Sequence, residues 1–488
     1  MPRTLEALEK VLAYGARRLS SAADSPVAAA SSIEKLRSAL NLPLPADPLG
    51  PELVTQHLID EAGPGMVFSS GGRFFGWVMG GTLPAALAAD WLVSLWDQNA
   101  AITATSPASA VIEEIAGRWV KELLGLPADA SFAFTTGCQM SHTTCLAAAR
   151  HSLLADAGWA VEQRGLFSAP PIRIVTGSQK HASVERSLRL LGFGLDALRI
   201  IPEQDDGTIS EEDLRSALAR EKGPAIVILN AGDLNIGAFD RFSSLIPIAK
   251  QAGAWVHVDG AFGLWLRASR ERRHLVEDID LADSWATDSH KWLNVPYDSG
   301  IAIVRDGAAH RAAMTVQASY IAPGEGVRDA IDWTPEWSRR ARAVPTYAAL
   351  RELGANGLAD LIDRTCDLTH RLATGIGALD GAVLLRDPQI NQALVRFEDE
   401  RAGASADDGD RRTDRVIELV NSGGSAFFTA TTWRGRRAMR ISLCNWQTNE
   451  ADLSRVIRSV EQAIAEAGRT CGRSKPRRGP KPIRVCPV

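Results

Sequence analysis

The sequence predicts an α/β fold, in which a mostly parallel sheet is flanked by helices and a smaller α+β domain follows. Through the middle of the chain, short apolar runs rich in β-branched residues alternate with helical patterns, and most runs end at a helix or a glycine turn. Such alternation is typical of a parallel sheet with helices on both faces. The expected strands cover residues 130–135, 172–176, 198–202, 225–230, 254–259, 284–287 and 300–305.

The pattern changes near Trp337, where a long helical stretch begins and antiparallel-like strands follow. A helix is predicted over 342–352 and 358–379, and strands over 393–397, 425–431 and 439–443. A chain of 488 residues exceeds one ordinary core, so a division is expected. We divide it into an amino-terminal helical arm (1–90), a large α/β domain (91–335), a small α+β domain (336–472) and a basic, proline-rich, disordered tail (473–488).

A lysine stands at the end of one predicted strand, in Asp288-Ser289-His290-Lys291-Trp292. A lysine in this setting can bind pyridoxal phosphate as a Schiff base. Its amine must lose a proton to react, and we expect partial desolvation to favour the neutral form. A surface lysine is the alternative.

An aspartate ends the buried strand 254–259, and small residues follow it. A carboxylate at this place can keep a pyridine nitrogen protonated, so that the ring withdraws electrons from the substrate Cα. We therefore predict that Asp259 contacts the cofactor ring. The alternative is a helix or turn cap.

The strand at 130–135 leads through a glycine turn into a helix, where backbone N–H groups and the helix dipole can receive a phosphate. An ordinary helix cap is the alternative. Asp288 would repel a phosphate, so we expect it to face the backbone or a cation. The candidate phosphate contacts are Gly137, Cys138, Gln139, Thr136 and Ser289.

His181 follows the strand 172–176 at the start of a helix, where an imidazole can lie flat over a pyridine ring. A solvated cap is the alternative. All these motifs come just after strands, which is where ligands bind on open α/β sheets. On the same ground Asn235, after the strand 225–230, is a weaker candidate.

Together these motifs resemble the group II pyridoxal-phosphate-dependent amino-acid decarboxylases, which have the fold type I architecture. The resemblance covers about residues 74–464. It implies that Lys291 carries the cofactor, Asp259 meets the ring nitrogen, His181 and Ala261 lie on opposite ring faces, and His290 belongs to the cofactor site. Its carriers are His181-x-Ser183-Val184-Glu185-Arg186, His257-Val258-Asp259-x-Ala261, His290-Lys291-Trp292, Ser338-Arg339-Arg340-x-Arg342 and Arg440-Ile441-Ser442.

Tyr320 looks like the family's mobile-loop tyrosine, which protonates the substrate carbon after carbon dioxide leaves. A phenol suits proton donation in a closed, water-poor site. In related aldehyde-forming enzymes a phenylalanine stands here, so tyrosine favours plain decarboxylation. The alternative is a loop aromatic that packs on a neighbour.

The expected substrate pocket departs from the aromatic-amino-acid decarboxylases. Where those enzymes receive bulky aromatics from a neighbouring subunit, this chain has Ala101 and Thr103. We predict that Phe75, Trp77 and Thr103 contact the substrate, although core packing is the commoner fate of such aromatics. The substrate itself stays open.

The resemblance implies decarboxylation of an L-amino acid to an amine and carbon dioxide. The alternatives are a pyridoxal-phosphate-dependent carbon–carbon lyase, an aldehyde-forming enzyme or aminotransferase on the same fold, and a cofactor-binding regulator. Catalytic roles fall to Lys291, Asp259, His181 and Tyr320.

Composition agrees with a soluble enzyme. A net charge of -4 indicates no nucleic-acid partner and no membrane surface. Six cysteines without metal-like spacing predict reduced thiols, a cytoplasmic location and no metal. No apolar run is long enough for a membrane span or secretory signal. Leu5, Leu8, Val11 and Leu12 form an amphipathic helical stripe, which by the resemblance lies in a homodimer interface. Packing within the chain is the alternative.

Overall fold

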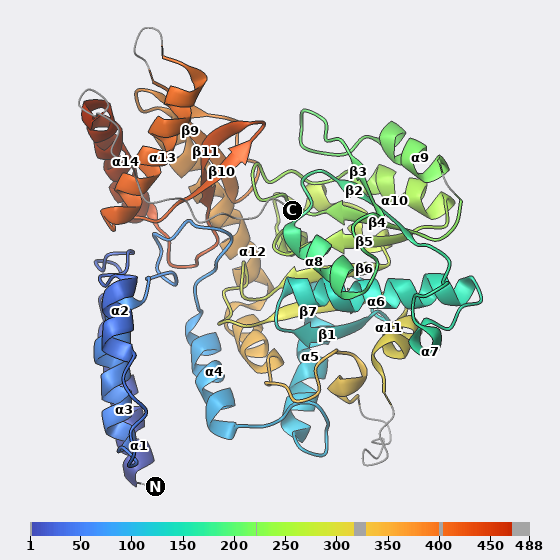
Figure 1. Ribbon diagram of the computed structural model, residues 1–488, viewed down its shortest axis with the longest axis horizontal. Helices are drawn as coiled ribbons and strands as arrows, with labels where there is room; N and C mark the ends of the chain where they lie inside the picture. The colour runs from blue at the N-terminus through green and yellow to red at the C-terminus, as the bar shows by residue number, and fades with distance from the viewer. Residues whose placement is uncertain (1, 221, 317–327, 400–403, 471–488) are drawn as a thin grey trace.

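The computed structural model describes residues 2–220, 222–316, 328–399 and 404–470, which form a large lobe, a small lobe and a helical arm (Figure 1). A seven-stranded sheet in the order β1-β7-β6-β5-β4-β2-β3 forms the centre of the large lobe. All seven expected strands are present, and the predicted fold class is confirmed. They are β1 (Ser131–Thr135), β2 (Arg173–Gly177), β3 (Leu198–Ile201), β4 (Ala225–Asn230), β5 (Trp255–Asp259), β6 (Ser284–Asp288) and β7 (Gly300–Val304).

The strand directions bring the predicted motifs to one edge of the sheet. Strands β3, β2, β4, β5 and β6 pair in parallel, whereas β7 runs antiparallel to both of its neighbours, β6 and β1. Strand β1 therefore points the same way as β5 and β6. The carboxyl ends of these three strands meet at the same edge, where ligands bind on open α/β sheets.

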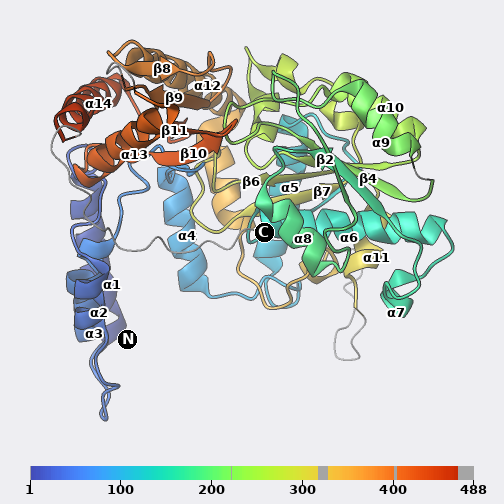
Figure 2. The same ribbon diagram turned by 45° about the horizontal axis from the view of Figure 1, so that its top comes forward.

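Helices cover both faces of the sheet (Figures 1 and 2). The long helix α6 (Cys138–Asp156) packs on β5, β6 and β7, and α10 (Phe242–Gln251) packs on β5. Trp265, Trp285 and Trp292 are fully buried between the layers. The other helices of this lobe are α4 (Pro84–Trp96), α5 (Pro107–Leu123), α7 (Val161–Arg164), α8 (Ala182–Leu190), α9 (Glu211–Ala219) and α11 (Gly307–Met314).

The small lobe is an antiparallel sheet in the order β10-β11-β9-β8. Helix α12 (Ala343–Gly377) connects the lobes, packing on α4 and α5 and also on β9 and α14. It is kinked at Gly354, whose φ of 59° and ψ of -179° suit glycine. The remaining elements are β8 (Ala382–Leu384), β9 (Gln392–Phe397), α13 (Ala406–Ser422), β10 (Thr429–Trp433), β11 (Arg436–Ser442) and α14 (Glu450–Thr470).

The amino-terminal arm stands beside the body of the molecule in both ribbon views (Figures 1 and 2). It comprises α1 (Pro2–Ser20), α2 (Ile33–Leu40) and α3 (Pro51–His57). Its apolar side chains are largely exposed in the single chain, including Leu8 at 50% and Leu12 at 59%. Among the described residues, no helix combines the length and the apolar character that a bilayer crossing requires.

Candidate active site

A cavity of about 300 Å³ opens at the carboxyl edge of the large sheet. Its wall combines the start of α6, the start of α8 and the segments that follow β4, β5 and β6. The structure therefore brings together most of the predicted cofactor residues. The lining consists of Gly137, Cys138, Gln139, Gln179, His181, Ser183, Asn230, Gly232, Asp233, Leu234, Asp259, Ala261, Phe262, Asp288, His290 and Lys291.

Lys291 projects into this cavity from the turn after β6 and forms an ion pair with Asp288, Nζ to Oδ2 at 3.0 Å. Burial is the largest single influence and would lower the pKa of Lys291, but the surrounding groups, above all the Asp288 carboxylate, together outweigh it and raise the pKa above its usual value. The prediction of a lowered pKa is therefore wrong for the chain by itself. The main chain is also tightly packed here, because a Cβ at Gly80 would clash with the Lys291 carbonyl oxygen.

Asp288 has partners on both carboxylate oxygens. Oδ1 accepts a hydrogen bond from the Cys138 backbone N–H at 2.6 Å, and Oδ2 lies 3.0 Å from Lys291 Nζ and 3.5 Å from His290 Nε2. The expectation that Asp288 faces the backbone or a cation is confirmed, since it contacts both. The carboxylate thus takes one of the α6 N–H groups that the sequence suggested for phosphate.

Asp259 ends β5 with its carboxylate at the cavity wall. Oδ1 accepts a hydrogen bond from the Ala261 N–H at 3.2 Å, and Oδ2 lies 3.4 Å from His142 Nε2. Burial opposes ionisation, but the pKa of Asp259 is still lowered, because His142, His181 and Lys291 favour the anion. A carboxylate that stays ionised can hold a proton on a pyridine nitrogen.

His181 is the N-cap of α8, so the capping role is real. Its Nδ1 accepts a hydrogen bond from the Ser183 backbone N–H at 3.2 Å, so in the neutral ring Nε2 carries the proton. The residue is exposed at the cleft, yet desolvation by the cleft walls lowers its pKa. A neutral, flat ring at the cavity wall is what stacking on a cofactor requires.

The predicted phosphate contacts divide into two groups. Gly137, Cys138 and Gln139 line the cavity, whereas Thr136 and Ser289 are not part of its wall. The Ser289 hydroxyl is buried, and among the described residues it has no hydrogen-bond partner. Backbone N–H groups at the start of α6 remain the main donors for an anion.

Pyridoxal phosphate fits this set of residues. The cavity offers an amine for a Schiff base, an ionised carboxylate for the ring nitrogen and an imidazole for the ring face. The unsatisfied Ser289 hydroxyl, two residues before the lysine, suits an additional acceptor oxygen. The volume is also at the lower end of small-molecule sites, which span roughly 300–1,000 Å³.

Comparison with known proteins agrees with the geometry. Residues 34–398 match the family model of the pyridoxal-dependent decarboxylase conserved domain. The L-2,4-diaminobutyrate decarboxylase of Rhizobium meliloti is 30% identical over 389 residues, covering 78% of this chain and 75% of that protein. The chain belongs to the pyridoxal-dependent decarboxylase family.

Further relatives of this family differ in their named substrates. The aromatic-L-amino-acid decarboxylase of Bacillus atrophaeus is 25% identical over 402 residues, covering 81% of each chain. The crystal structure of Oryza sativa TDC with pyridoxal phosphate and tryptamine superposes with a TM-score of 0.89 at 21% identity, covering 96% of this chain and 98% of that one. That likeness shows the fold type I architecture. The predicted family and cofactor are confirmed, and the chain is a pyridoxal-phosphate-dependent carboxy-lyase.

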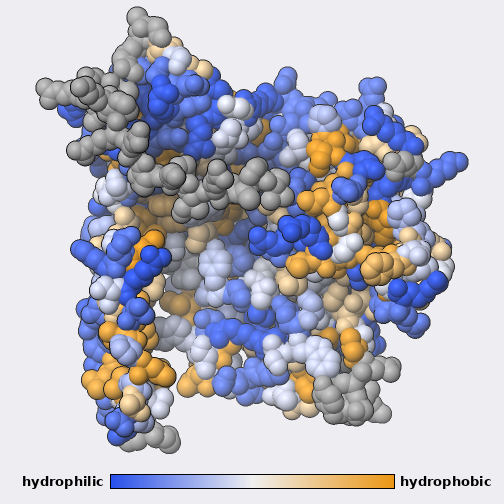
Figure 3. All heavy atoms as spheres, viewed as in Figure 1, coloured by the Kyte–Doolittle hydropathy of each residue, from blue (hydrophilic) through white to orange (hydrophobic). Residues whose placement is uncertain are grey.

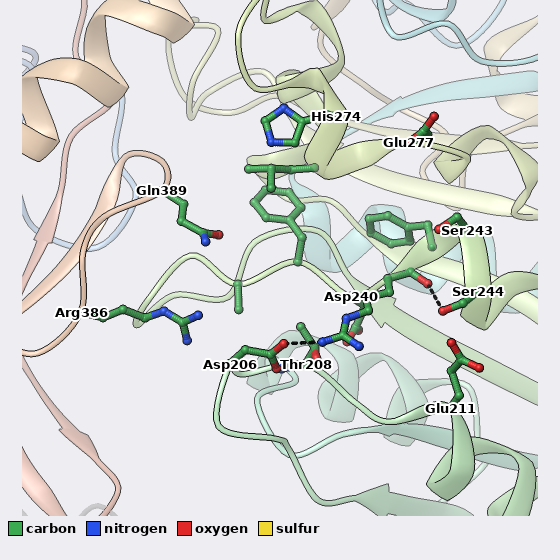
Figure 4. A pocket seen from close by; sticks show the side chains of 15 residues that line it. Asp206, Thr208, Glu211, Asp240, Ser243, Ser244, His274, Glu277, Arg386 and Gln389 are labelled. Carbon is green, nitrogen blue, oxygen red and sulfur yellow. Dashed lines mark hydrogen bonds and ion pairs between the residues drawn. The ribbon is translucent and has the colours of Figure 1, made fainter.

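A second hollow of about 440 Å³ lies elsewhere in the molecule, where Arg386 and Gln389 approach the loop around Asp206 (Figure 4). Its wall contains no lysine, so it cannot hold pyridoxal phosphate as a Schiff base. Asp206 in this hollow is paired with Arg241 at 2.7 Å. The decarboxylase chemistry therefore belongs to the cavity around Lys291.

Several predicted contacts lie outside the cavity wall. Phe75 is fully buried in the small-lobe core and stacks on Phe428, which matches the packing alternative rather than substrate contact. Trp77 is half exposed, and Thr103 binds Asp329 through its N–H at 2.7 Å and its hydroxyl at 2.8 Å.

Two other predicted residues need separate mention. Asn235 donates a hydrogen bond to the cavity residue Gln179 at 2.9 Å and accepts one from Thr431 at 3.0 Å, so it joins the cavity wall to the small lobe. Tyr320 lies outside the described residues.

The structure also shows residues to which the sequence assigned no role. His142 reaches Asp259 from α6, and His257 lies behind His142 on β5. Arg440 on β11 is buried, lies close enough to His181 to lower its pKa, and has an Nε without a hydrogen-bond partner among the described residues. The sequence signal for His257 was its spacing. Residues two apart on a strand point to the same face, so His257 shares its face of β5 with Asp259.

Proposed function

We propose that this chain removes the α-carboxylate of an L-amino acid, giving the amine and carbon dioxide, with pyridoxal phosphate bound to Lys291. The observation that carries this proposal is the meeting of Lys291, Asp259 and His181 in one cavity. The family match supports the same reaction. Carbon–carbon lyase, aldehyde-forming and aminotransferase activities remain the rivals that product analysis must exclude.

When bound, pyridoxal phosphate supplies an electron-withdrawing ring that accepts the electron pair of the breaking Cα–carboxylate bond. Asp259 holds a proton at the ring nitrogen, and its lowered pKa keeps it ionised for this purpose. His181 and Ala261, which both line the cavity, would hold the ring plane between them. Lys291 Nζ must first lose its proton, which requires its ion pair with Asp288 to loosen.

Two groups are candidates for returning a proton to the substrate carbon. We assign this role to Tyr320, with His181 as the second candidate. The lowered pKa of His181 and the hydrogen bond at its Nδ1 leave a neutral ring with a proton on Nε2. Such a ring can donate hydrogen bonds, but it is a weaker acid than an imidazolium.

Arg440 is a candidate for binding the substrate carboxylate. Arg440 is buried, its charge helps to lower the pKa of His181, and its guanidinium has an unused donor at Nε among the described contacts. An arginine binds a carboxylate through paired hydrogen bonds. Replacing Arg440 with Lys or Met should raise KM more than it lowers kcat.

We further propose that the enzyme is a homodimer. Helix α1 approaches α4 at Gly15, where a Cβ would lie 3.8 Å from the Trp91 ring, and on α4 Trp91 is 44% and Leu95 68% exposed. Apolar side chains colour much of the arm surface in Figure 3. Exposed apolar surface on this scale marks an interface in a soluble protein.

We propose a cytoplasmic location on the basis of the thiols. The cysteines in the described part of the chain are Cys138, Cys145, Cys366 and Cys444, and each is buried and free. A disulfide-rich design would be expected in an oxidising compartment.

The experiment is a substrate screen. Purified enzyme with added pyridoxal phosphate is incubated with each common L-amino acid and with L-2,4-diaminobutyrate, while carbon dioxide and the organic product are measured. The proposal predicts equal amounts of carbon dioxide and amine from at least one substrate. An aldehyde in place of the amine, with or without carbon dioxide, or an amino group transferred to a keto acid, would overturn it.

A further inference from the structure

A chain of buried polar side chains runs behind Asp259, away from the cavity. His142 Nε2 lies 3.4 Å from Asp259 Oδ2, and His142 Nδ1 lies 2.9 Å from His257 Nε2. His257 Nδ1 lies 2.9 Å from Ser284 Oγ, which accepts a hydrogen bond from Trp255 Nε1 at 2.9 Å. The two histidines and the serine are fully buried.

The end of this chain fixes the direction of its hydrogen bonds. An ionised Asp259 can only accept, so a favourable contact requires the proton of His142 on Nε2. When His142 carries only this proton, its Nδ1 accepts from His257 Nε2–H, and His257 Nδ1 then accepts from the Ser284 hydroxyl. The opposite assignment would point a nitrogen lone pair at the carboxylate.

Burial supports a neutral His257 in this arrangement. Desolvation, followed by the influence of His142, lowers the pKa of His257 to about 3, so His257 is uncharged at neutral pH. The His257 donor can therefore point toward His142 without adding a buried charge at His257. Chains of aligned hydrogen bonds strengthen one another in a low-dielectric interior.

Cys138 is the competing partner in this cluster. Its Sγ lies 3.5 Å from His142 Nε2 and 4.0 Å from Asp259 Oδ1. The three side chains are close enough to chelate a cation, but a metal needs a thiolate. Burial, Asp288 and Asp259 raise the pKa of the Cys138 thiol well above its usual value. The thiol therefore serves as a weak donor toward Asp259.

We propose that His142 is a positioning residue of this decarboxylase. Backed by His257 and Ser284, it is fixed as the Nε2–H tautomer and holds Asp259 ionised and oriented toward the cofactor's ring nitrogen. The inference rests on the proposed function, because it assigns Asp259 to that nitrogen. His142 acts through Asp259 and does not line the cavity.

The test measures the visible absorption of the bound cofactor as a function of pH. In His142→Leu, Asp259 loses a hydrogen-bond donor, so its carboxylate becomes more basic. The carboxylate then takes a larger share of the proton from the cofactor's ring nitrogen. With the ring less protonated, the Lys291 nitrogen that is bound to the cofactor becomes more basic. The midpoint of the absorption change should rise by about one pH unit, the size expected for losing one hydrogen bond to a charged group. His142→Gln, which retains an N–H donor, should stay near the wild type.

The chain provides a matched control. His310 is also fully buried and hydrogen-bonded, to Ser131 at 2.8 Å and to the Trp333 carbonyl at 2.9 Å, but it is absent from the cavity wall. His310→Leu should destabilise the fold to a similar degree and should leave the midpoint of the absorption change where it is in the wild type. If His142→Leu does not fold, His257→Leu breaks the chain one step further back and should shift the midpoint in the same direction by less.

A double variant separates positioning from general damage. The ionisable groups facing Asp259 are His142 and Cys138 from α6, His181 at the start of α8, and Lys291 after β6. Once Asp259 is replaced by Asn, adding His142→Leu should cause no further shift. A shift that persists in the Asp259→Asn background, or a His142→Leu midpoint equal to the wild type, would overturn the inference. A wild-type protein that gains no visible band with pyridoxal phosphate would overturn the proposed function itself.

Discussion

The cavity around Lys291 and the amino-terminal arm differ in whether their side chains find partners within a single chain. In the cavity, Asp288 and Asp259 each have partners on both carboxylate oxygens. On the arm, Leu8 and Leu12 face water with half or more of their surface. The comparison teaches that the charged side chains of the cavity find their partners within one chain, whereas the apolar side chains of the arm do not.

This difference also separates two kinds of prediction. Changes in the cavity should alter chemistry while leaving assembly intact, and changes on the arm should alter assembly first. The largest expected effect comes from the residue on which the chemistry depends.

Replacing Lys291 with Ala should lower decarboxylation by at least about a thousandfold, because the positioned amine is lost. The oligomeric state should not change. Steady-state carbon dioxide release and light scattering together test this. A decline of less than tenfold would break the assignment of chemistry to this cavity.

The second effect concerns the arm. The double change Leu8→Glu and Leu12→Glu puts charges on the exposed stripe of α1, and burying a leucine contributes roughly 1.5–3 kcal/mol. In a two-fold interface each change counts twice, so we expect a monomer by light scattering and activity reduced about tenfold or more at low protein concentration.

Glu9→Gln on the same helix is the control for this double variant, since Glu9 is also exposed. It should leave the molar mass unchanged. An unchanged mass in the leucine variant would show that the arm packs on its own chain.

The third effect is a loss of stability in acid. It can be compared between His257, which lies behind the cavity, and His310, which lies remote from it. Desolvation lowers the pKa of both His257 and His310 to about 3. Below pH 6.5 these histidines bind a proton in the unfolded chain but not in the folded chain. Each histidine should therefore lower the free energy of unfolding by about 1 kcal/mol per pH unit between about pH 6 and 4.

Urea unfolding of the cofactor-free protein at several pH values measures this slope. His310→Gln removes one of these protonation sites, and so does His257→Gln. Each substitution should therefore reduce the pH dependence of the unfolding free energy by the contribution of one proton. A slope unaffected by both substitutions would mean that these rings are charged in the folded state.

The smallest effect is expected at Cys138. Because burial and two carboxylates raise the pKa of its thiol, the sulfur is protonated and is no nucleophile. Cys138→Ser should retain activity within about twofold, and iodoacetamide should not modify Cys138 in the folded enzyme at pH 8. Rapid modification with loss of activity would contradict the buried environment.

The sequence predicted the strands of the large sheet because β-branched runs bounded by turns are local signals. It did not predict the direction of β7, which depends on where the strand inserts between β1 and β6. Strand β8 was missed, since it is short and half exposed at the sheet edge. The kink at Gly354 divides α12 close to the predicted gap in the helical pattern.

For the site, chemistry-bearing residues at strand ends were readable from the sequence, but their pairing was not. The raised pKa of Lys291 depends on the orientation of Asp288, which only the three-dimensional structure gives. His142 was hidden because a helical histidine gains meaning only when the helix is packed on β5. Phe75 shows the reverse case, an aromatic in a promising motif that belongs to the core.

Borohydride reduction of the enzyme with bound pyridoxal phosphate, followed by peptide mass spectrometry, tests the central claim most directly. Reduction makes the Schiff base permanent and marks the lysine that formed it. The account predicts the pyridoxyl-phosphate mass on the peptide containing Lys291. A label on another lysine, or a chromophore that survives in Lys291→Ala, would contradict it.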